Sequence, residues 1–372
     1  MHNPYFHQGD LKETTVDSIV PYVLSAELWE WRDITRIQME FNGLLGRHIA
    51  TQLRDRRDTV FVLDIVKRFD DIPFFQADIS DDGAVLSVLK KCGATCVIHN
   101  ASPPATIAKP SLFWKVNVDG TKAIVAACIE AGVKKLIFTS SSAVVFDGSD
   151  LNNIVETQPY TTKPANVYME TKIHAEKIIL DANGKNGLST VILRPSGIFG
   201  PGDRQLIAGL YSNYLAGRTN IQIGNNKNLT DWTPVQNVAD AHILAADRLS
   251  NPVSKDQPVA GQIFFITNDD PWYFWDFTNA VWDRLDIYFP GKRQKKSPII
   301  IPSWFGMILG NTFELIGWIS GQKPAMNRFT IAFSCAARWH NITKAKTTLG
   351  YKPRVAIKDE LDELVKAMVD EP

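Results

Sequence analysis

Short apolar runs alternate with longer amphipathic segments between residues 34 and 267. The apolar runs predict strands, and segments whose apolar residues recur every three or four positions predict helices. Strands are predicted at 34–39, 59–64, 72–78, 95–102, 133–142, 189–195 and 261–267. Helices are predicted at 43–53, 81–92, 116–132, 166–181 and 236–249. Because strands and helices alternate and the strands are largely apolar, we expect an α/β fold, with a doubly wound parallel sheet covered on both faces.

The two ends of the chain depart from this alternation. Residues 1–33 show no clear period and are expected to form a divergent N-terminal extension. After Gly200 the pattern loosens, and from about residue 270 the composition becomes aromatic and apolar. We therefore expect residues 34–203 and 231–267 to form a Rossmann-type dinucleotide-binding domain. Residues 204–230 and 268–372 are expected to form a smaller, substrate-binding lid.

The apolar segment 298–321 is long enough to suggest a membrane span. It contains Asn311 and Glu314, and a carboxylate near the middle of a bilayer costs roughly 3 kcal/mol. Over the predicted helix 302–320, large apolar residues fall on one face, while the glycines, Asn311 and Glu314 gather on or near the other. We expect an amphipathic helix that lies in a membrane surface or covers an apolar substrate; the alternative is a buried helix of the lid.

The composition of the 372 residues narrows the class of protein. Lysine plus arginine and aspartate plus glutamate number 40 each, so no net charge attracts nucleic acid. The four cysteines are irregularly spaced and show no metal-type pairing with histidine, which favours buried thiols in a reducing compartment. The N-terminus lacks a basic region followed by an apolar one, so no secretory signal is expected. The basic run 291–297 is expected to be a solvated loop.

Tyr168 and Lys172 form a Y-x-x-x-K pair within the predicted helix 166–181. At this spacing the phenol and the ammonium lie on the same helical face. A free tyrosine has a pKa near ~10, and a nearby cation favours the phenolate, which can then take a proton from an alcohol as hydride leaves its carbon. A second copy, Tyr288 to Lys292, contains Pro290 and Gly291, which break a helix, so we interpret it as chance.

The serines at 140–142 end a predicted strand. The carboxyl ends of parallel strands form the binding crevice of such sheets, so a serine there can donate to the substrate oxygen and hold it against Tyr168. Ser142 is the first candidate and Ser141 a close competitor; the alternative is a serine-rich turn that caps the strand. Asn117, on the preceding helix, could anchor a water that relays protons through the lysine of the pair.

A dinucleotide site requires a glycine turn after the first strand and an acidic residue about 20 positions later. Gly43 and Gly46, with Leu44 between them, are spaced as the last two glycines of such a turn. Asp64 ends the next strand, where a carboxylate can accept a hydrogen bond from a ribose 2′-hydroxyl. An acid there repels a 2′-phosphate, so NAD is favoured over NADP, although NADP stays possible.

Further candidates for this cofactor site follow the third and fourth strands. Asp78 and Ile79 are placed to meet the adenine, and Asn100, Ala101 and Ser102 let the backbone pass close to the cofactor. An aspartate after a strand is more often a cap, so each fragment is weak alone. Their order along a series of strand–helix–strand units is the stronger signal.

Several motifs occur together in a fixed order: HNAS, VNVDGT, FTSSSAVVFDG, the Y-x-x-x-K pair, LRPSGIFGPGDRQL and DWTPVQNVADAH. In this order they resemble the extended short-chain dehydrogenase/reductase family. The 3β-hydroxysteroid dehydrogenase branch, which includes enzymes acting on sterol 4α-carboxylates, is the most similar. IFGPGDRQL, DWTPVQNVADAHILAA and RWHNITKAKTTLGYKPRV carry the likeness to that branch, which covers about residues 42–360.

The resemblance implies an activity and a set of partners. The expected reaction is NAD(P)-dependent oxidation of the 3β-hydroxyl of a sterol 4α-carboxylate, or a related triterpenoid, to the 3-ketone with loss of CO2. It implies catalytic roles for Tyr168, Lys172 and a serine at 141–142, with Tyr168, Lys172, Pro195, Gly197 and Ile198 also in the cofactor site. It implies the cytoplasmic face of the endoplasmic reticulum membrane, a homodimer through the helix of Tyr168, and other enzymes of sterol C4-demethylation as possible partners.

Position 40 departs from the family pattern. The family has three glycines in the turn that opens its dinucleotide site. The first of them would fall at position 40, where this chain has Glu40. A glutamate adds a side chain and a negative charge beside the pyrophosphate, which opposes binding at a helix N-terminus. Either the N-terminal sequence is an altered gene product or cofactor affinity is reduced, so a cofactor-impaired sterol-binding protein is one alternative. The other is a nucleotide-sugar epimerase or reductase of the same superfamily, which would want a basic, polar lid.

Overall fold

A computed structural model describes residues 35–39, 43–104, 109–203, 206–254, 256, 258–321 and 327–370. Residues 34–372 form one compact unit. The predicted extension, residues 1–33, and the glutamate at position 40 lie outside the described residues.

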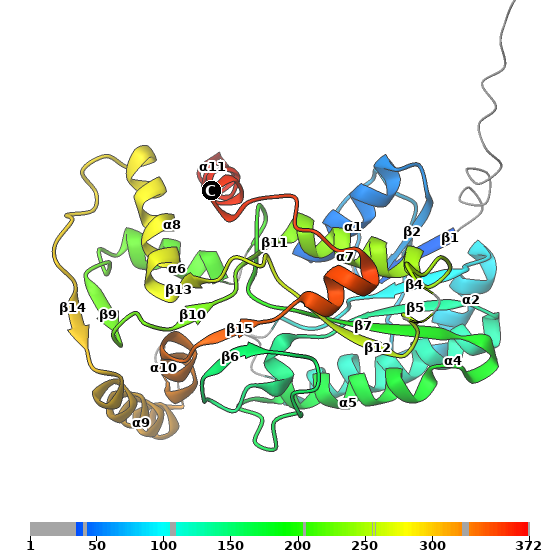
Figure 1. The fold of residues 1–372 in the computed structure, drawn as a ribbon, viewed down its shortest axis with the longest axis horizontal. Helices are drawn as coiled ribbons and strands as arrows, with labels where there is room; N and C mark the ends of the chain where they lie inside the picture. Colours follow the sequence, from blue (N-terminus) through cyan, green and yellow to red (C-terminus); the bar gives the residue numbers. More distant parts are fainter. Residues whose placement is uncertain are drawn as a thin grey trace, which may run out of the picture. The chain divides into compact units, whose positions relative to one another are not determined.

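The central element is a seven-stranded sheet whose strands all pair in parallel (Figure 1). In order across the sheet, the strands are β3 (Phe74–Gln76), β2 (Thr59–Asp64), β1 (Thr35–Met39), β4 (Cys96–His99), β5 (Lys135–Thr139), β7 (Ser189–Pro195) and β12 (Gln262–Ile266). From β1 the chain adds β2 and β3 on one side of the sheet and then β4, β5, β7 and β12 on the other. The strand order therefore reverses between β1 and β4, and open α/β sheets bind ligands at such a switch point. The predicted doubly wound parallel sheet is confirmed.

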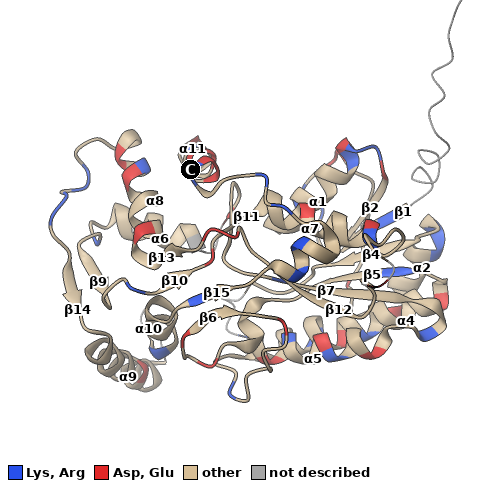
Figure 2. Ribbon diagram, in the orientation of Figure 1, with Lys and Arg blue, Asp and Glu red and all other residues tan. Residues whose placement is uncertain are grey.

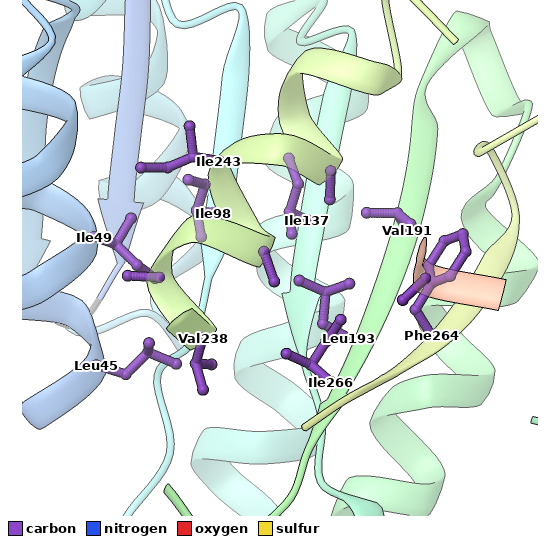
Figure 3. Packing of buried hydrophobic residues seen from close by; sticks show 14 of the residues in the cluster. Leu45, Ile49, Ile98, Ile137, Val191, Leu193, Val238, Ile243, Phe264 and Ile266 are labelled. Carbon is purple, nitrogen blue, oxygen red and sulfur yellow. The ribbon is translucent and has the colours of Figure 1, made fainter. Parts of the chain in front are cut away.

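Helices cover both faces of this sheet (Figure 1). One face carries α1 (Leu44–Asp55) and α7 (Val235–Arg248); the other carries α2 (Asp82–Cys92), α4 (Thr121–Ala131) and α5 (Val167–Ala182). Figure 3 shows apolar side chains of α1 and α7 packed against those of the strands, among them Leu45, Ile49, Ile98, Ile137, Val191, Leu193, Val238, Ile243, Phe264 and Ile266. Strands buried on both faces explain the near-continuous apolar runs of the sequence.

The first strand, β1, contains two long polar residues. The side chains of Arg36 and Gln38 are fully buried. Arg36 donates to Asp247 at 2.6 Å, and the amide of Gln38 contacts that of Asn100. These contacts compensate for the burial of polar groups that would otherwise destabilise a central strand.

Three predicted strands are clearly shorter in the structure. The run predicted at 95–102 forms only β4, which ends at His99. The run predicted at 72–78 forms only β3, because Pro73 precedes it and Asp78 begins a turn by accepting from Ser80 N. The strand predicted at 133–142 ends at Thr139, after which a short helix, η3 (Ser142–Val145), begins.

The helix predicted at 116–132 begins earlier and changes its geometry. It starts with α3 (Pro110–Phe113), continues as a π-helix, η2 (Trp114–Gly120), and ends with α4. At Gly120 a Cβ would lie 2.8 Å from Cδ1 of Ile79, so a larger residue there would require the side chain of Ile79 to move. A π-helix inserts an extra residue per turn and is frequent at functional sites.

Smaller sheets and further helices complete the unit. The sheets are β13-β10-β15-β6, β14-β9 and β11-β8, built from β6 (Leu151–Ile154), β8 (Ile198–Phe199), β9 (Ile221–Ile223), β10 (Leu229–Thr230), β11 (Thr233–Pro234), β13 (Trp272–Tyr273), β14 (Ile299–Ile301) and β15 (Arg338–His340). The helices are α6 (Leu206–Leu215), α8 (Phe274–Tyr288), α9 (Ser303–Ser320), α10 (Arg328–Cys335) and α11 (Ile357–Asp370), with short turns η4 (Lys185–Gly187) and η5 (Ala345–Leu349).

Helix α9 buries its glycines rather than its large apolar residues. Gly306, Gly310 and Gly317 are its buried residues, whereas Trp304 and Trp318 are 66% and 80% exposed. The amphipathic helix predicted at 302–320 is present, and the alternative of a buried lid helix does not hold. Across the described parts of the chain, we find no helix with the length and apolar character needed to span a membrane.

Candidate active site

The parallel sheet brings most predicted site residues to its carboxyl edge. Gly43 follows β1, Asp64 ends β2, Asn100 follows β4, the serines follow β5, and Pro195 ends β7. These five strands are neighbours in the sheet, so residues spread over 150 positions of the chain come to one edge.

Helix α5 positions the Tyr168–Lys172 pair. It begins after Asn166, whose side chain accepts from Met169 N at 3.0 Å as an N-cap. Tyr168 is half-buried and its ring meets the ring of Phe113 edge-on, with centroids 6.2 Å apart. Lys172 is buried, and its Nζ donates to the carbonyl of Thr139, the last residue of β5, at 2.9 Å. Lys172 therefore links the helix that carries Tyr168 to the end of β5.

The three serines differ in their hydrogen bonds. Ser141 Oγ accepts from Ala143 N at 3.2 Å and so caps η3. Ser142 is the first residue of η3, is half-buried, and its hydroxyl has no partner among the described residues. Ser140 is buried. The cap leaves the hydroxyl of Ser142 available to a substrate, which favours Ser142 over Ser141.

The π-helix η2 turns Asn117 toward α5. Asn117 is buried, and its Nδ2 donates to Thr171 Oγ1 at 3.0 Å, next to Lys172 in the chain. Its Oδ1 is buried and has no partner in the part of the chain that the structure describes. A buried acceptor of this kind is where a bridging water gains a hydrogen bond, as the predicted proton relay requires.

His99 is buried near the Tyr168–Lys172 pair, and it was not identified from the sequence. Thr121 Oγ1 donates its only proton to Asn117 O at 2.6 Å, so it must accept from His99 Nε2, 2.9 Å away. Burial, followed by the charge of Lys172, lowers the pKa of His99 to about 3, so the ring stays neutral. The HNAS motif contains this histidine, and its place at the end of β4 was the available signal.

The N-terminus of α1 fits a phosphate group. Gly43 is its N-cap and makes no side-chain hydrogen bond, and the first turn carries no acidic residue. Leu44 packs against the core and Gly46 is buried. Free backbone N–H groups and the helix dipole at such an end attract an anion.

The two aspartates predicted for the cofactor site differ. Asp64 is half-buried at the end of β2 and its Oδ1 accepts from Ile65 N at 2.6 Å. Asp78 accepts from Ser80 Oγ at 2.7 Å and from Lys115 Nζ at 2.8 Å. Although burial opposes it, these bonds hold the pKa of Asp78 at about 2. Asp78 therefore acts as a turn cap, and Ile79 is buried beside it.

Two segments close the cofactor edge. Asn100 is buried, Ala101 is half-buried, and Ser102 Oγ donates to Pro103 O at 3.3 Å. At the end of β7, Pro195 is buried, and Gly197 has a φ of +53° with the carbonyl of Asp231 where a Cβ would lie. Ile198 begins β8, which pairs with Thr233 of β11. Only glycine allows the backbone of this segment to approach so closely.

The segments DWTP and RWHN are joined by a buried, hydrogen-bonded aspartate–histidine pair. Asp231 Oδ2 accepts from both the backbone N and Nδ1 of His340, each at 2.8 Å. Both side chains are buried, and burial raises the pKa of Asp231 despite the hydrogen bonds of His340. Thr233 N in turn donates to Gly197 O at 2.9 Å, so this pair supports the segment after β7.

The open parallel sheet, the switch point beside α1 and a Tyr–Lys pair behind a serine-ended strand define a short-chain dehydrogenase/reductase. The chain belongs to the 3-beta hydroxysteroid dehydrogenase/isomerase family, whose model matches residues 42–295. The predicted family is confirmed.

Relatives and solved structures agree with this family and fold. The chain is 38% identical over 344 residues to sterol-4-alpha-carboxylate 3-dehydrogenase, decarboxylating, of Saccharomyces cerevisiae, covering 89% of this chain and 96% of that one. It is 37% identical to the Homo sapiens protein of the same name, covering 88% and 86%. UDP-glucose 4-epimerase of Thermus thermophilus, solved with NAD, shares the fold with a TM-score of 0.65, 20% identity and 91% and 100% coverage. A putative epimerase from Burkholderia cenocepacia matches with a TM-score of 0.68, 19% identity and 91% and 99% coverage.

Proposed function

We propose that this protein oxidises the 3β-hydroxyl of a sterol 4α-carboxylate, or a related triterpenoid, to the 3-ketone with loss of CO2. The relatives named for this reaction span most of the chain. The observation that carries the proposal is the buried Lys172, held at the end of β5 one helical turn from the half-buried Tyr168. That placement suits a phenolate base at the carboxyl edge of the sheet.

Each residue has a defined task in the oxidation. Ser142 donates its hydroxyl hydrogen to the substrate oxygen and holds it beside Tyr168. Tyr168 takes the hydroxyl proton as the C–H bond at C3 breaks, and the charge of Lys172 favours the phenolate that does so. When bound, a nicotinamide dinucleotide supplies the acceptor for the departing hydride. A water on Asn117 would return protons from the pair to solvent.

Decarboxylation follows from the product of that oxidation. The new C3 ketone lies β to the C4 carboxylate. As the bond between C4 and the carboxyl carbon breaks, its electron pair moves to the ketone as an enolate and CO2 leaves. The enolate then takes a proton at C4. The protein therefore needs only the oxidation step and a site that accepts one carboxylate.

NAD is the proposed cofactor. The support is Asp64, which ends β2 where its carboxylate would accept a hydrogen bond from a ribose 2′-hydroxyl and would repel a 2′-phosphate. Steady-state kinetics with both cofactors test this choice. We expect a higher kcat/KM with NAD, and Asp64→Asn should narrow the difference; a preference for NADP would contradict it.

One experiment separates this function from the two alternatives. The chain is incubated with NAD and a 4-carboxysterol, and NADH and CO2 are measured in equal amounts. A nucleotide-sugar epimerase or reductase would not turn over the sterol, and an impaired binding protein would bind the sterol without forming NADH. Residues 270–320 are aromatic and apolar, which favours an apolar substrate over a sugar diphosphate.

We also propose that α9 and β14 rest on the cytoplasmic surface of the endoplasmic reticulum membrane. Apart from the glycines, α9 exposes large apolar residues, and Ile299 and Ile300 of β14 are 60% and 57% exposed. Glu314 is paired with Arg328 at 2.7 Å. Figure 2 shows α9 with few charged residues. Exposed tryptophans beside an apolar stripe are typical of surface-bound helices.

A homodimer through α5 and contacts with other enzymes of sterol C4-demethylation stay predictions.

The charge of the adjoining loop supports this membrane contact. Residues 291–297 carry four cations, two of which, Arg293 and Lys295, pair with Asp283 and Asp286. Vesicle flotation tests the contact. A Trp304→Ser and Trp318→Ser variant should lose most of its vesicle binding, whereas Ile287→Ser, which alters a 75% exposed residue of α8, should keep it. Equal binding of both variants would contradict the proposal.

A further inference from the structure

Helix α5 carries a third buried functional group on the same side as Tyr168 and Lys172. Glu176 lies one turn beyond Lys172 and is fully buried. It accepts from Arg194 Nε at 2.9 Å and from Arg194 Nη2 at 2.7 Å. A third donor, Tyr160 Oη, lies 2.8 Å from its Oε2. We call Tyr160, Glu176 and Arg194 the Glu176 cluster.

We propose that the Glu176 cluster positions the catalytic base against the strand end that faces the cofactor, and balances the charge around Lys172. This inference rests on the proposed function, because it assigns roles within that reaction. Glu176 and Arg194 are positioning residues, since neither is expected to touch the substrate.

The geometric argument begins with the place of Arg194 in the chain. It belongs to β7 and directly precedes the segment from Pro195 to Gly197. That segment is fixed on its other side by Thr233, whose Oγ1 donates to Ser196 O at 2.5 Å. A bidentate pair with a carboxylate has a defined distance and direction. The pair therefore sets the spacing between α5, which carries the base, and the end of β7.

This spacing matters because two groups act on one substrate bond. The phenolate takes the proton from the substrate oxygen while hydride leaves the attached carbon toward the cofactor. A displacement of about 1 Å between such groups costs on the order of 100-fold in rate. A rigid link between the helix of the base and the strand end at the cofactor prevents that displacement.

The electrostatic argument concerns the charge that the cluster presents to Lys172. The carboxylate of Glu176 and the guanidinium of Arg194 are 0% and 2% exposed and cancel each other. Among the other charged groups around the cluster, Lys177 Nζ lies 5.8 Å from the ring centroid of Tyr160, and Lys344 interacts electrostatically with Glu156 and Arg194. His99 on β4 is neutral. Burial and the charge of Glu176 raise the pKa of Tyr160, so its hydroxyl stays a donor. Loss of the negative charge alone would leave the buried guanidinium of Arg194 without its counter-charge, on the side of α5 that carries Lys172.

Two variants separate charge from geometry. Glu176→Gln removes the charge and keeps the shape, so the pKa of Tyr168 should fall by about one unit. Arg194→Lys keeps the charge and loses the bidentate bond, so the pKa should stay and kcat should fall about tenfold with little change in KM. The pKa is read by NMR titration of 13C-labelled tyrosine, with the Tyr168 signal assigned by Tyr168→Phe.

A milder pair of variants keeps the test decisive if Glu176→Gln fails to fold. Tyr160→Phe removes one hydrogen bond and leaves the ion pair, and should lower kcat about threefold with thermal stability nearly unchanged. Tyr214→Phe is the matched control, because it also removes one hydrogen bond from a tyrosine to a carboxylate that pairs with an arginine. Tyr214 donates to Asp286 at 3.0 Å, and Asp286 pairs with Arg293 in the lid. It should leave kcat unchanged.

The outcomes are distinct. An unshifted Tyr168 signal in a folded Glu176→Gln variant would overturn the electrostatic part, and equal kcat for Tyr160→Phe and Tyr214→Phe would overturn the geometric part. The titration requires neither cofactor nor substrate. A wild-type chain without turnover would therefore remove the proposed function, while the titration still reports on the Glu176 cluster.

Discussion

Tyr168 owes its assignment to its neighbours rather than to its motif. The other Y-x-x-x-K copy begins at Tyr288, the last residue of α8, and its Gly291 has a φ of +78°, so the helix ends before Lys292. The predicted break is confirmed. In contrast, Lys172 is one turn into a continuous helix and reaches the carbonyl of Thr139.

This difference predicts opposite results for the same substitution at two sites. Tyr168→Phe should lower kcat by about 10²–10⁴-fold, because it removes the general base. Tyr288→Phe should leave kcat unchanged. Initial rates of NADH formation measure both, with circular dichroism to verify the folds. Activity retained in Tyr168→Phe would remove the assignment of the base.

The serines after β5 allow a second prediction at this scale. Ser142→Ala should lower kcat and leave stability unchanged, because its hydroxyl has no partner among the described residues. Ser141→Ala should lower the unfolding free energy by about 1 kcal/mol through loss of its cap to Ala143 N, with kcat nearly retained. Kinetics and urea unfolding distinguish the two. The reverse pattern would make Ser141 the catalytic serine.

At the scale of elements, the apolar pattern correctly predicted those strand and helix ends that depend on the local sequence. Strands β2 and β7 have the predicted ends, and α5 begins directly after its predicted first residue, Asn166. The π-helix η2 was not predicted, because the apolar periodicity of residues 116–132 indicated a regular helix. The Glu176 cluster was missed for a different reason: its ion pair joins residues on different elements, 18 positions apart.

Helix α9 shows the same limit and yields a test. Its buried face is set by distant residues: a Cβ on Gly310 would lie 2.8 Å from Ile331 Cδ1 and 3.0 Å from Arg328 N. Gly310→Ala should therefore lower the unfolding free energy by about 1–2 kcal/mol, although alanine favours helices. Gly209→Ala in α6 is the control, because a Cβ there meets nothing within 4 Å. It should be neutral or stabilising in thermal unfolding, because alanine lowers the entropy of the unfolded chain. Equal losses in the two variants would contradict a role for the packing of Gly310.

At the scale of the whole molecule, segments close to the C-terminus return to the Rossmann sheet. Lys344 Nζ donates to Ile263 O of β12 at 2.8 Å, and Tyr351 Oη donates to Thr267 O at 3.0 Å. Helix α11 then places Glu360 beside Gly200 and Val235, on the segments that follow β8 and begin α7. The chain end thus packs beside the segment that follows β8 and the start of α7.

Glu360 makes the stability of the whole fold depend on pH. It is 1% exposed, and burial raises its pKa from 4.5 to about 7, while a hydrogen bond from Gln236 opposes the shift. The unfolded chain releases this proton near pH 4.5, and the folded chain keeps it until about pH 7. The unfolded state therefore binds fewer protons in this window, so the stability contributed by Glu360 is present below pH 4.5 and is lost as pH rises to 7.

The size of this effect is about 3 kcal/mol, because each pKa unit corresponds to about 1.4 kcal/mol. Glu360→Gln should remove it, so that the variant exceeds the wild type in unfolding free energy at pH 8 and matches it near pH 4.5. Urea unfolding across this range measures the difference in unfolding free energy between the variant and the wild type. The buried His99 and His242, whose pKa values burial lowers to about 3 and about 4, contribute the opposite pH dependence. Both proteins contain these histidines, so their contribution cancels in the difference. Glu363→Gln, on the exposed side of α11, should follow the wild-type curve closely, because the charge of Glu363 is the smallest of the causes that act on the pKa of Glu360. Parallel curves for Glu360→Gln and the wild type would show that the carboxyl of Glu360 ionises normally in the folded protein.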